Sequence, residues 1–371
     1  MTQTFLPLMG RAAAATLITA RATSGSPRPV FAPVDALPDR ESIEGSDQGD
    51  APRPPSSPRS SVSAVDIALL VFLGAVWGAA FLFFRIAAPV VGPIWTAEIR
   101  IALAGIALAV VVGPAAFRSI RGRVRQVALV GATFSAIPFT LLSIAALTLP
   151  ASLESLLMAT TPLFTALVSS AWIGQRLTRP MVVGLAIGFG AVAVLLGGAP
   201  IAITPATILA FGAGLGAALS YAVAGTYVRR AVADIPPLHL ATGQLVLGAL
   251  LLLPVAFLSG TPGTPIPAAI ESLITMAILS TAIAWPIFFR ISRQTNPTAA
   301  STVTFIVPMF GVLWGGVFLG ESIGPGLLAG FGLVLLSLIL VLRLPFPIGR
   351  VRLVGRVGRV FPARASAAAR P

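Results

Sequence analysis

The feature that most constrains this chain is a series of apolar runs, each of about 20 residues, which starts at Asp66 and continues almost to the end of the sequence. A helix of that length crosses a hydrocarbon core about 30 Å thick. Lipid cannot satisfy open backbone groups, and the runs lack the alternating polarity of barrel strands, so helices are expected. We predict an all-α integral membrane protein with ten transmembrane helices, over residues 66–88, 94–115, 126–148, 152–173, 180–198, 205–227, 238–258, 270–289, 299–319 and 325–343.

Composition supports this fold class and excludes several kinds of chemistry. Of the 371 residues, 56% are hydrophobic and 10% are charged, and the mean hydropathy of +0.94 lies far above that of ordinary soluble domains. Cysteine is absent and His239 is the single histidine, which excludes disulfides, thiol chemistry and histidine-rich metal sites. We therefore expect neither a metal nor another cofactor, and we interpret His239 as an interfacial residue.

The positions of the arginines predict the orientation of the chain. All 25 basic residues are arginine. Arginines occur in the connections after the even-numbered predicted spans, whereas the connections after the odd-numbered spans carry none. By the positive-inside rule, both termini lie in the cytoplasm of a multi-pass protein of the plasma membrane. The net charge of +13 is spread over tails and loops instead of one patch, so no nucleic-acid partner is expected.

The two terminal segments differ from the membrane part. Residues 1–64 are rich in proline, serine and mixed charges, which predicts a disordered cytoplasmic tail. Their start faintly resembles a transit peptide, and the alternative is a dispensable tail or a start codon assigned too far upstream. The presence of this segment in the mature protein is left open. Residues 346–371 form a basic cytoplasmic tail whose charge fits contact with anionic lipid.

The membrane part contains an internal repeat. Residues 151–177 align with residues 297–323, and further upstream Arg100 stands opposite Gln244. Two domains of five helices result, one of residues 65–200 and one of residues 201–345. An odd number of spans gives the halves opposite orientations, as the alternating arginines also indicate. Inverted five-helix repeats favour alternating access around a central site.

Four segments carry a resemblance to a known family: "GAVWGAAFLFFRIA" (74–87), "EIRIALAG" (98–105), "MATTPLFTALV" followed by "IGQRLT" (158–178), and "FIVPMFGVLWGGVFLGESI" (305–323). Together, in their duplicated order, they resemble the EamA family of the drug/metabolite transporter superfamily over about residues 66–343. The resemblance implies ten helices, a central pathway between the halves, and transport of small metabolites, often efflux, without ATP hydrolysis. Gln175 departs from the family's "GE" pair, of which Glu321 keeps the acid.

Charged residues inside the predicted spans are candidate functional positions, because each costs about 2.5–3.5 kcal/mol at a helix centre. Glu98 and Arg100 lie about 200° apart on one helix and need separate partners. One hypothesis is that both residues, with Arg85 and Glu154, line the outward half of a pathway, where they bind a polar substrate or relay protons. The alternative is an ion pair between Arg85 and Glu98 with interfacial snorkelling.

Aromatic, amide and proline residues complete the candidate pathway. Aromatic side chains at corresponding regions of the two repeats are predicted to line a substrate cavity, with Gln244 as a neutral polar contact. These aromatic candidates are Trp77, Phe139, Tyr221 and Trp285. Pro162 and Pro308 are predicted to bend or break their helices and to serve in gating. Glu271 and Glu321 are interpreted as solvated residues at outer helix ends.

The leading functional hypothesis is a secondary transporter that exports small metabolites or drugs by alternating access, with proton coupling as an option. The alternative is a passive channel or a non-transporting membrane scaffold. Zinc-protease, nucleophile-elbow and phosphate-loop motifs are absent from the sequence, so an enzyme is not expected. The expected partners are the lipid bilayer and a small-molecule substrate whose identity the sequence leaves open. A homodimer is an open alternative to a monomer.

Overall fold

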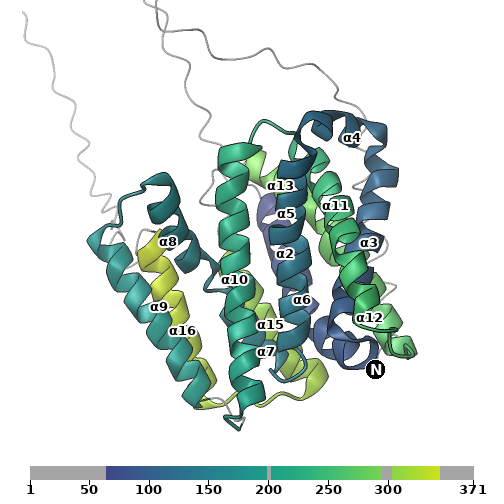
Figure 1. Cartoon of the computed structure of the whole chain (residues 1–371). Coiled ribbons are helices and arrows are strands. Elements are labelled where there is room, and N and C mark those ends of the chain that lie inside the picture. Colours follow the sequence, from purple (N-terminus) through teal and green to yellow (C-terminus); the bar gives the residue numbers. More distant parts are fainter. Residues whose placement is uncertain (1–63, 199–201, 295–302, 343–371) are drawn as a thin grey trace, which may run out of the picture.

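The structure is a computed structural model that describes residues 64–198, 202–294 and 303–342, and the regular elements in these ranges are helical (Figure 1). The first half contains α2 (Ala64–Val91), α3 (Pro93–Val112), α4 (Pro114–Ile120), the 3-10 turn η3 (Arg121–Arg123), α5 (Val124–Gly131), the π-helical η4 (Ala132–Ala136), α6 (Ile137–Ala145), α7 (Ala151–Met158), α8 (Thr161–Ile173) and α9 (Arg179–Gly198). The second half contains α10 (Pro205–Ala231), α11 (Pro237–Leu258), α12 (Pro267–Ala277), the π-helical η5 (Ile278–Ile283), α13 (Ala284–Gln294), α15 (Val303–Leu319) and α16 (Pro325–Leu342).

The predicted all-α membrane fold class is confirmed. Within the described ranges, nine helical stretches are long and apolar enough to cross a membrane, and α15 is a shorter apolar helix at the ninth predicted span. The predicted start of that span, at residue 299, lies outside the described residues. The predicted tails, 1–64 and 346–371, also lie outside them except for Ala64.

The arginine-rich connection after the second span was expected to be a loop, and the structure corrects this. Pro114 opens a helical stretch that runs to Ala145, so Arg118 lies in α4 and not in a loop. Gly113 ends α3 with a φ of 70°, and proline fits the first turn of the next helix. The segment has no long apolar run, which is why the hydropathy pattern did not reveal it.

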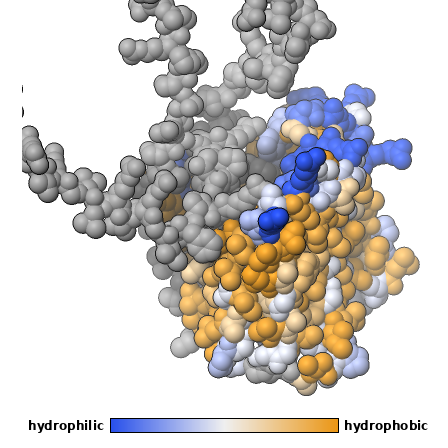
Figure 2. Space-filling model, turned by 90° about the vertical axis from the view of Figure 1, so that its left-hand side faces the viewer, coloured by the Kyte–Doolittle hydropathy of each residue, from blue (hydrophilic) through white to orange (hydrophobic). Residues whose placement is uncertain are grey.

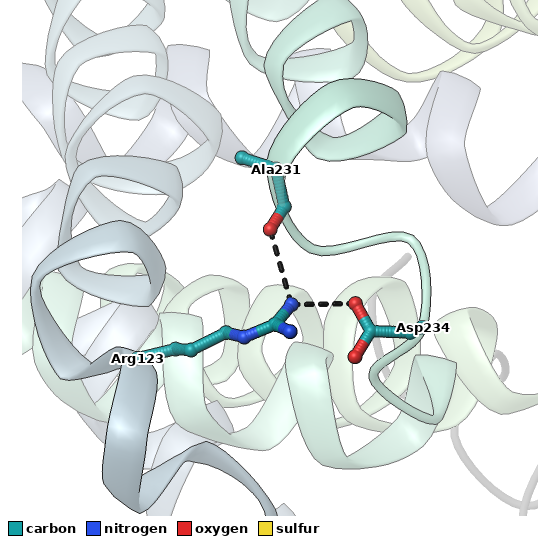
Figure 3. A network of polar contacts seen from close by, with 3 residues as sticks. All are labelled: Arg123, Ala231 and Asp234. Atoms are coloured by element: carbon teal, nitrogen blue, oxygen red, sulfur yellow. Dashed lines mark hydrogen bonds and ion pairs between the residues drawn. The ribbon is translucent and has the colours of Figure 1, made fainter.

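The chain passes alternately between two ends of the bundle. α4 and η3, the α8–α9 connection and the α10–α11 connection share the upper end in Figure 1, which we call the basic end. Arg123 of η3 pairs there with Asp234 and also donates to the carbonyl oxygen of Ala231 (Figure 3). The hydrogen bond from Arg123 lowers the pKa of Asp234 below its ordinary value. Figure 2 shows hydrophilic side chains gathered at one end, above a mainly hydrophobic surface.

Small residues let helices of the two halves approach closely. α2 packs on α15, α3 on α11, and α9 on α16. A methyl group at Gly78 would lie 2.8 Å from the carbonyl oxygen of Val307, and one at Gly184 would lie 3.0 Å from that of Ser337. Gly212, by contrast, faces open space. Helices of the two halves therefore pack directly on each other, and both halves contribute residues to the interface between them.

Candidate functional site

Two π-helical segments mark corresponding places in the two halves. η4 interrupts the third span and η5 interrupts the eighth span, and extending the repeat alignment pairs Ser135 with Thr281 inside them. A π-helical turn is wider than an α-helical one and is frequent at functional sites. The hydropathy pattern did not predict these segments. Their one sequence signal is a hydroxyl residue at the same repeat position within an apolar span.

Arg100 is buried at the centre of the bundle, where it contacts η5 and two aromatic rings. Its guanidinium carbon lies 3.9 Å from the ring centroid of Phe139 and 4.9 Å from that of Phe84. Its Nε donates to Thr281 Oγ1 at 3.2 Å, and Nη1 lies 3.9 Å from Met276 Sδ. No carboxylate among the described residues comes within ion-pair distance. Aromatic faces and neutral acceptors therefore hold this cation.

Gln244, the counterpart of Arg100 in the repeat, makes the corresponding contact from the second half to the first. Its Oε1 accepts a hydrogen bond from Ser135 Oγ of η4 at 2.9 Å, and the side chain is buried. Arg100 thus contacts the π-helical segment of the second half, and Gln244 contacts that of the first. These two cross-contacts obey the inverted symmetry, with a charge on one side only.

The four predicted aromatic residues lie in one connected set. Trp77 contacts Trp285 at a centroid distance of 5.8 Å, and Phe139 contacts Tyr221 at 6.4 Å. Phe134 of η4, which was not among the predicted residues, joins the two pairs, with its ring centroid 5.2 Å from those of both Tyr221 and Trp285. We call Trp77, Arg100, Phe139, Tyr221, Gln244 and Trp285 the central cluster.

The central cluster adjoins a cavity on the side of the basic end. This cavity of about 170 Å³ is lined by residues of α5, η4, α10, α11 and α13, and Phe134, Gln244 and Trp285 form part of its wall. Val232, Ala233 and Ile235 of the α10–α11 connection also line it, and Ala233 is exposed at the basic end. The space next to the cluster is therefore hollowed toward the end of the bundle that carries the arginines.

Two predicted carboxylates are buried without satisfying their oxygen atoms. Glu154 of α7 is 0% exposed, and neither of its carboxylate oxygens has a hydrogen-bond partner. Arg85, Arg100 and Glu321 act on it electrostatically. Glu98 of α3 is also buried, and its Oε2 has no partner. Burying a polar atom without a hydrogen-bond partner costs free energy, so a function is a reason for a protein to keep such an atom.

The ion pair considered for Arg85 and Glu98 is not present. Arg85 Nη1 donates instead to the carbonyl oxygens of Ala146 and Leu147, at 2.8 and 3.1 Å. These carbonyls follow the end of α6, where the last backbone acceptors of a helix lack intrahelical partners and attract a cation. Arg85 therefore stabilises a helix end, and Glu98 has no arginine within ion-pair distance among the described residues.

The interpretation of Glu321 as a solvated residue was wrong. Its two carboxylate oxygens accept the backbone N–H groups of Ala151 and Ser152, at 2.6 and 2.9 Å, at the first turn of α7. The N–H groups at a helix start have no intrahelical acceptor, so a carboxylate satisfies them. Gly315 leaves the space that the carboxylate occupies. Glu271, in contrast, is exposed.

The remaining predicted positions are placed as follows. The fourth span is interrupted between α7 and α8, and Pro162 lies in the first turn of α8. Pro308 lies inside α15, which continues through it from Val303 to Leu319, so no break occurs there. His239 Nδ1 lies 3.1 Å from Ser119 Oγ at the basic end.

Comparison with known proteins decides the family. The EamA-like transporter family matches the chain twice, over residues 66–197 and 208–343. The chain belongs to this family. The resemblance noted from the sequence is thereby confirmed, and the protein is a multi-pass membrane transporter of the EamA-like type with two matching units.

Individual relatives of this EamA-like transporter are distant. The uncharacterized transporter YvbV of Bacillus subtilis is 27% identical over 74% of this chain and 90% of its own length. A probable terminal-alkyne amino-acid exporter of Streptantibioticus cattleyicolor is 28% identical over 78% and 97%. The uncharacterized inner membrane transporter YedA of Escherichia coli is 24% identical over 72% of this chain and 87% of its own length. A solved crystal structure has a TM-score of 0.54 over 75% of this chain and 96% of its own, at 17% identity, which supports the fold alone.

Proposed function

We propose that this EamA-like transporter exports small organic solutes by alternating access, with proton coupling. The observation that carries the proposal is the central cluster, in which the counterparts Arg100 and Gln244 each bond the π-helical segment of the other half, and Gln244 lies in the wall of a cavity. Such a site can face either end when the pseudo-symmetric halves exchange conformations. A polar site at the middle of the bundle is also where secondary transporters bind their substrates.

In this proposal, different side chains contact different parts of the solute. Arg100 is a buried cation without a carboxylate partner, so it suits an anionic group of the solute. The aromatic set offers apolar faces to the rest of the solute, and Gln244 offers a neutral polar contact. Glu154, buried and without a partner, is the group that we propose to bind the coupled proton.

One relative supports an amino-acid-like solute. The Streptantibioticus cattleyicolor protein is named for export of a terminal-alkyne amino acid, at 28% identity. An amino acid carries the carboxylate that Arg100 suits. We therefore propose that the solute is an amino acid or a similar compound. A screen of amino acids with different side chains would identify which of them is transported.

Flux measurements in inverted membrane vesicles test the proposal. A panel of radiolabelled amino acids is added outside, and a proton gradient, acid inside, is imposed. Saturable uptake above the external concentration, abolished by a protonophore, supports coupled export. Uptake that only equilibrates without saturation would favour the passive channel. Absence of flux for the panel and for solutes found by comparing the exometabolomes of cells with and without the gene would favour the scaffold.

We further propose that the protein lies in the plasma membrane, with the basic end and both termini on the cytoplasmic side. The arginines at this end support the orientation. The chain has no cysteine, so an introduced cysteine is the one thiol available for labelling. A cysteine at Ser119, near the basic end, is expected to react with an impermeant maleimide in inverted vesicles and not in intact cells. The reverse pattern would contradict the orientation.

A further inference from the structure

A second hollow, apart from the central cluster, lies at the basic end between α8, α9, α10 and α16. Its volume is about 750 Å³, which is within the range of small-molecule sites. Its wall combines two arginines of α10, hydroxyl residues of α8 and apolar residues of α8 and α16. Representative members are Arg229, Arg230, Thr165, Ser169, Ile173 and Leu342. We call this hollow the arginine cleft.

The two arginines of the cleft are held by neutral groups. Arg229 Nη2 donates to Ser169 Oγ at 3.0 Å and to Thr226 Oγ1 at 3.2 Å. Arg230 Nη1 donates to the carbonyl oxygen of Trp172 at 3.4 Å. No aspartate or glutamate lines the cleft, and no carboxylate of the described part of the chain lies within ion-pair distance of either arginine.

Arg123, at the same end of the bundle, provides a contrast. Its guanidinium is neutralised by Asp234 from the α10–α11 connection (Figure 3). The acid of this connection thus pairs with η3, and it does not pair with the two arginines of α10 in the cleft. Guanidinium groups presented together bind phosphate oxygens well, because their N–H groups match the geometry of the anion.

The wall of the cleft also contains exposed apolar side chains. Trp172 is 42% exposed and Ile173 is 51% exposed at the end of α8, and the Trp172 ring stacks on Tyr227 with centroids 6.2 Å apart. Tryptophan and tyrosine at the ends of transmembrane helices lie at the level of lipid headgroups. A ligand that satisfies the whole cleft therefore needs both an anionic group and an apolar part.

We propose that the arginine cleft binds an anionic phospholipid from the leaflet at the basic end. The phosphate contacts Arg229 and Arg230, and the acyl chains follow the apolar residues of α8 and α16. The segment that follows Leu342 is a poor occupant, because residues 343–371 carry seven arginines and no acid, and like charges repel. Inorganic phosphate is also a poor occupant, because it leaves the apolar wall uncovered.

This lipid would connect the two halves of the transporter, since α8 belongs to the first half and α10 to the second. It would stabilise the conformation in which the cleft is open. The proposal concerns a site separate from the central cluster, so it does not depend on the identity of the transported solute or on the direction of transport.

Thermal unfolding of the purified full chain in detergent tests the proposal. Added phosphatidylglycerol is expected to raise the Tm, and phosphatidylcholine at equal concentration is expected to have little effect. In the double variant Arg229→Gln/Arg230→Gln, phosphatidylglycerol should bind roughly 30-fold more weakly, because each arginine contributes to attraction by an anionic surface. The concentration of this lipid that gives half of the maximal rise in Tm should increase by the same factor. The matched control, Arg118→Gln/Arg121→Gln, removes two arginines from the same end outside the cleft and should keep the preference.

Three results would overturn the proposal in this assay. The double variant could keep the full preference, the control could lose as much of it, or inorganic phosphate could raise the Tm as strongly as the lipid. The last result would make the cleft a site for a free anion. A failure of the vesicle transport assay would leave all three readings unchanged, so the two proposals are tested separately.

Photo-crosslinking identifies the occupant directly. Gln175 lines the cleft, and the chain has no cysteine, so Gln175→Cys gives a single site for a benzophenone maleimide. In vesicles of equal parts phosphatidylglycerol and phosphatidylcholine, mass spectrometry should find mainly the phosphatidylglycerol adduct. Adding Arg229→Gln/Arg230→Gln should remove that preference. Equal adducts of both lipids, or a crosslink to residues 343–371 of the chain itself, would contradict the proposal.

Discussion

At the scale of single residues, the sequence located the polar positions of the central cluster but not their partners. Arg100 and Gln244 stood out because they are polar, lie within apolar spans and align in the repeat. That Arg100 lies over Phe139 and bonds Thr281 depends on how α3 meets α6 and η5, which no local pattern specifies. Pairing rules based on depth alone also failed for Arg85, whose nearest acceptors are backbone carbonyls.

Substitution of Arg100 tests the proposed contact with the anionic group. Arg100→Ala removes the charge and the contacts with both rings, so transport should fall at least about tenfold. Arg100→Lys keeps the charge and should retain part of the activity with a higher KM. Vesicle flux per unit of inserted protein is the measurement. Equal activity of all three proteins would assign Arg100 to structure.

Glu154 tests the coupling proposal. Glu154→Gln cannot release a proton, so uptake driven by a proton gradient should be lost, whereas exchange of labelled for unlabelled solute without a gradient should persist. Glu98→Gln should impair transport as well, because the buried Oε2 of Glu98 has no partner and lies on the same helix as Arg100. Glu271→Gln, at an exposed carboxylate, is the matched control and should behave as the unmodified protein. Gradient-driven uptake that survives Glu154→Gln would exclude this residue as the proton site.

At the scale of elements, hydropathy predicted the spans well because lipid imposes length and polarity on every helix that crosses it. It did not predict features that depend on turns and hydrogen bonds. The π-helical η4 and η5, the helical α4 and the break between α7 and α8 all arise within or beside apolar sequence. Glu321 acquires its role from the start of α7, which is distant in sequence.

The contact between Glu321 and α7 should stabilise the fold at the end opposite the basic end. Glu321→Gln removes the charge and one of the two acceptor oxygens. The free energy of unfolding should therefore fall by about 1 kcal/mol, the usual effect of losing a helix N-terminal cap. The Tm of the purified protein measures this. Glu271→Gln again serves as the control, and an equal shift in both variants would show that the loss is not specific to the cap.

Close approach of α5 and α11 at Gly131 can be tested in the same way. A methyl group there would lie 2.8 Å from the backbone nitrogen of Gly248, which cannot move without shifting a helix. Gly131→Ala should therefore destabilise the protein by about 1–3 kcal/mol. Gly212→Ala places the same group in open space within α10 and should be neutral or slightly stabilising. Melting curves that rank the two variants in the reverse order would contradict the packing.

At the scale of the whole molecule, the inverted repeat explains both what the two halves share and where they differ. α2, α3 and α9 of the first half pack on α15, α11 and α16 of the second, so each half packs directly against the other. The sequence revealed the repeat, since five-helix symmetry leaves an alignable pattern. It did not reveal which end is hollowed, because both conformations of a transporter satisfy the same pattern of spans.

The hollowed end leads to a prediction about access. In this conformation Val228, which is half-buried, lines the cavity beside the central cluster, and Ser152 is buried at the opposite end, where Glu321 holds α7. Val228→Cys should therefore react with an impermeant thiol reagent in inverted vesicles, and Ser152→Cys should be protected on either side. Under alternating access, conditions that favour the other conformation should protect Val228→Cys and expose Ser152→Cys in intact cells. Simultaneous reaction of both cysteines under one condition would indicate a continuous pore, because an alternating transporter never opens the same site to both ends at once.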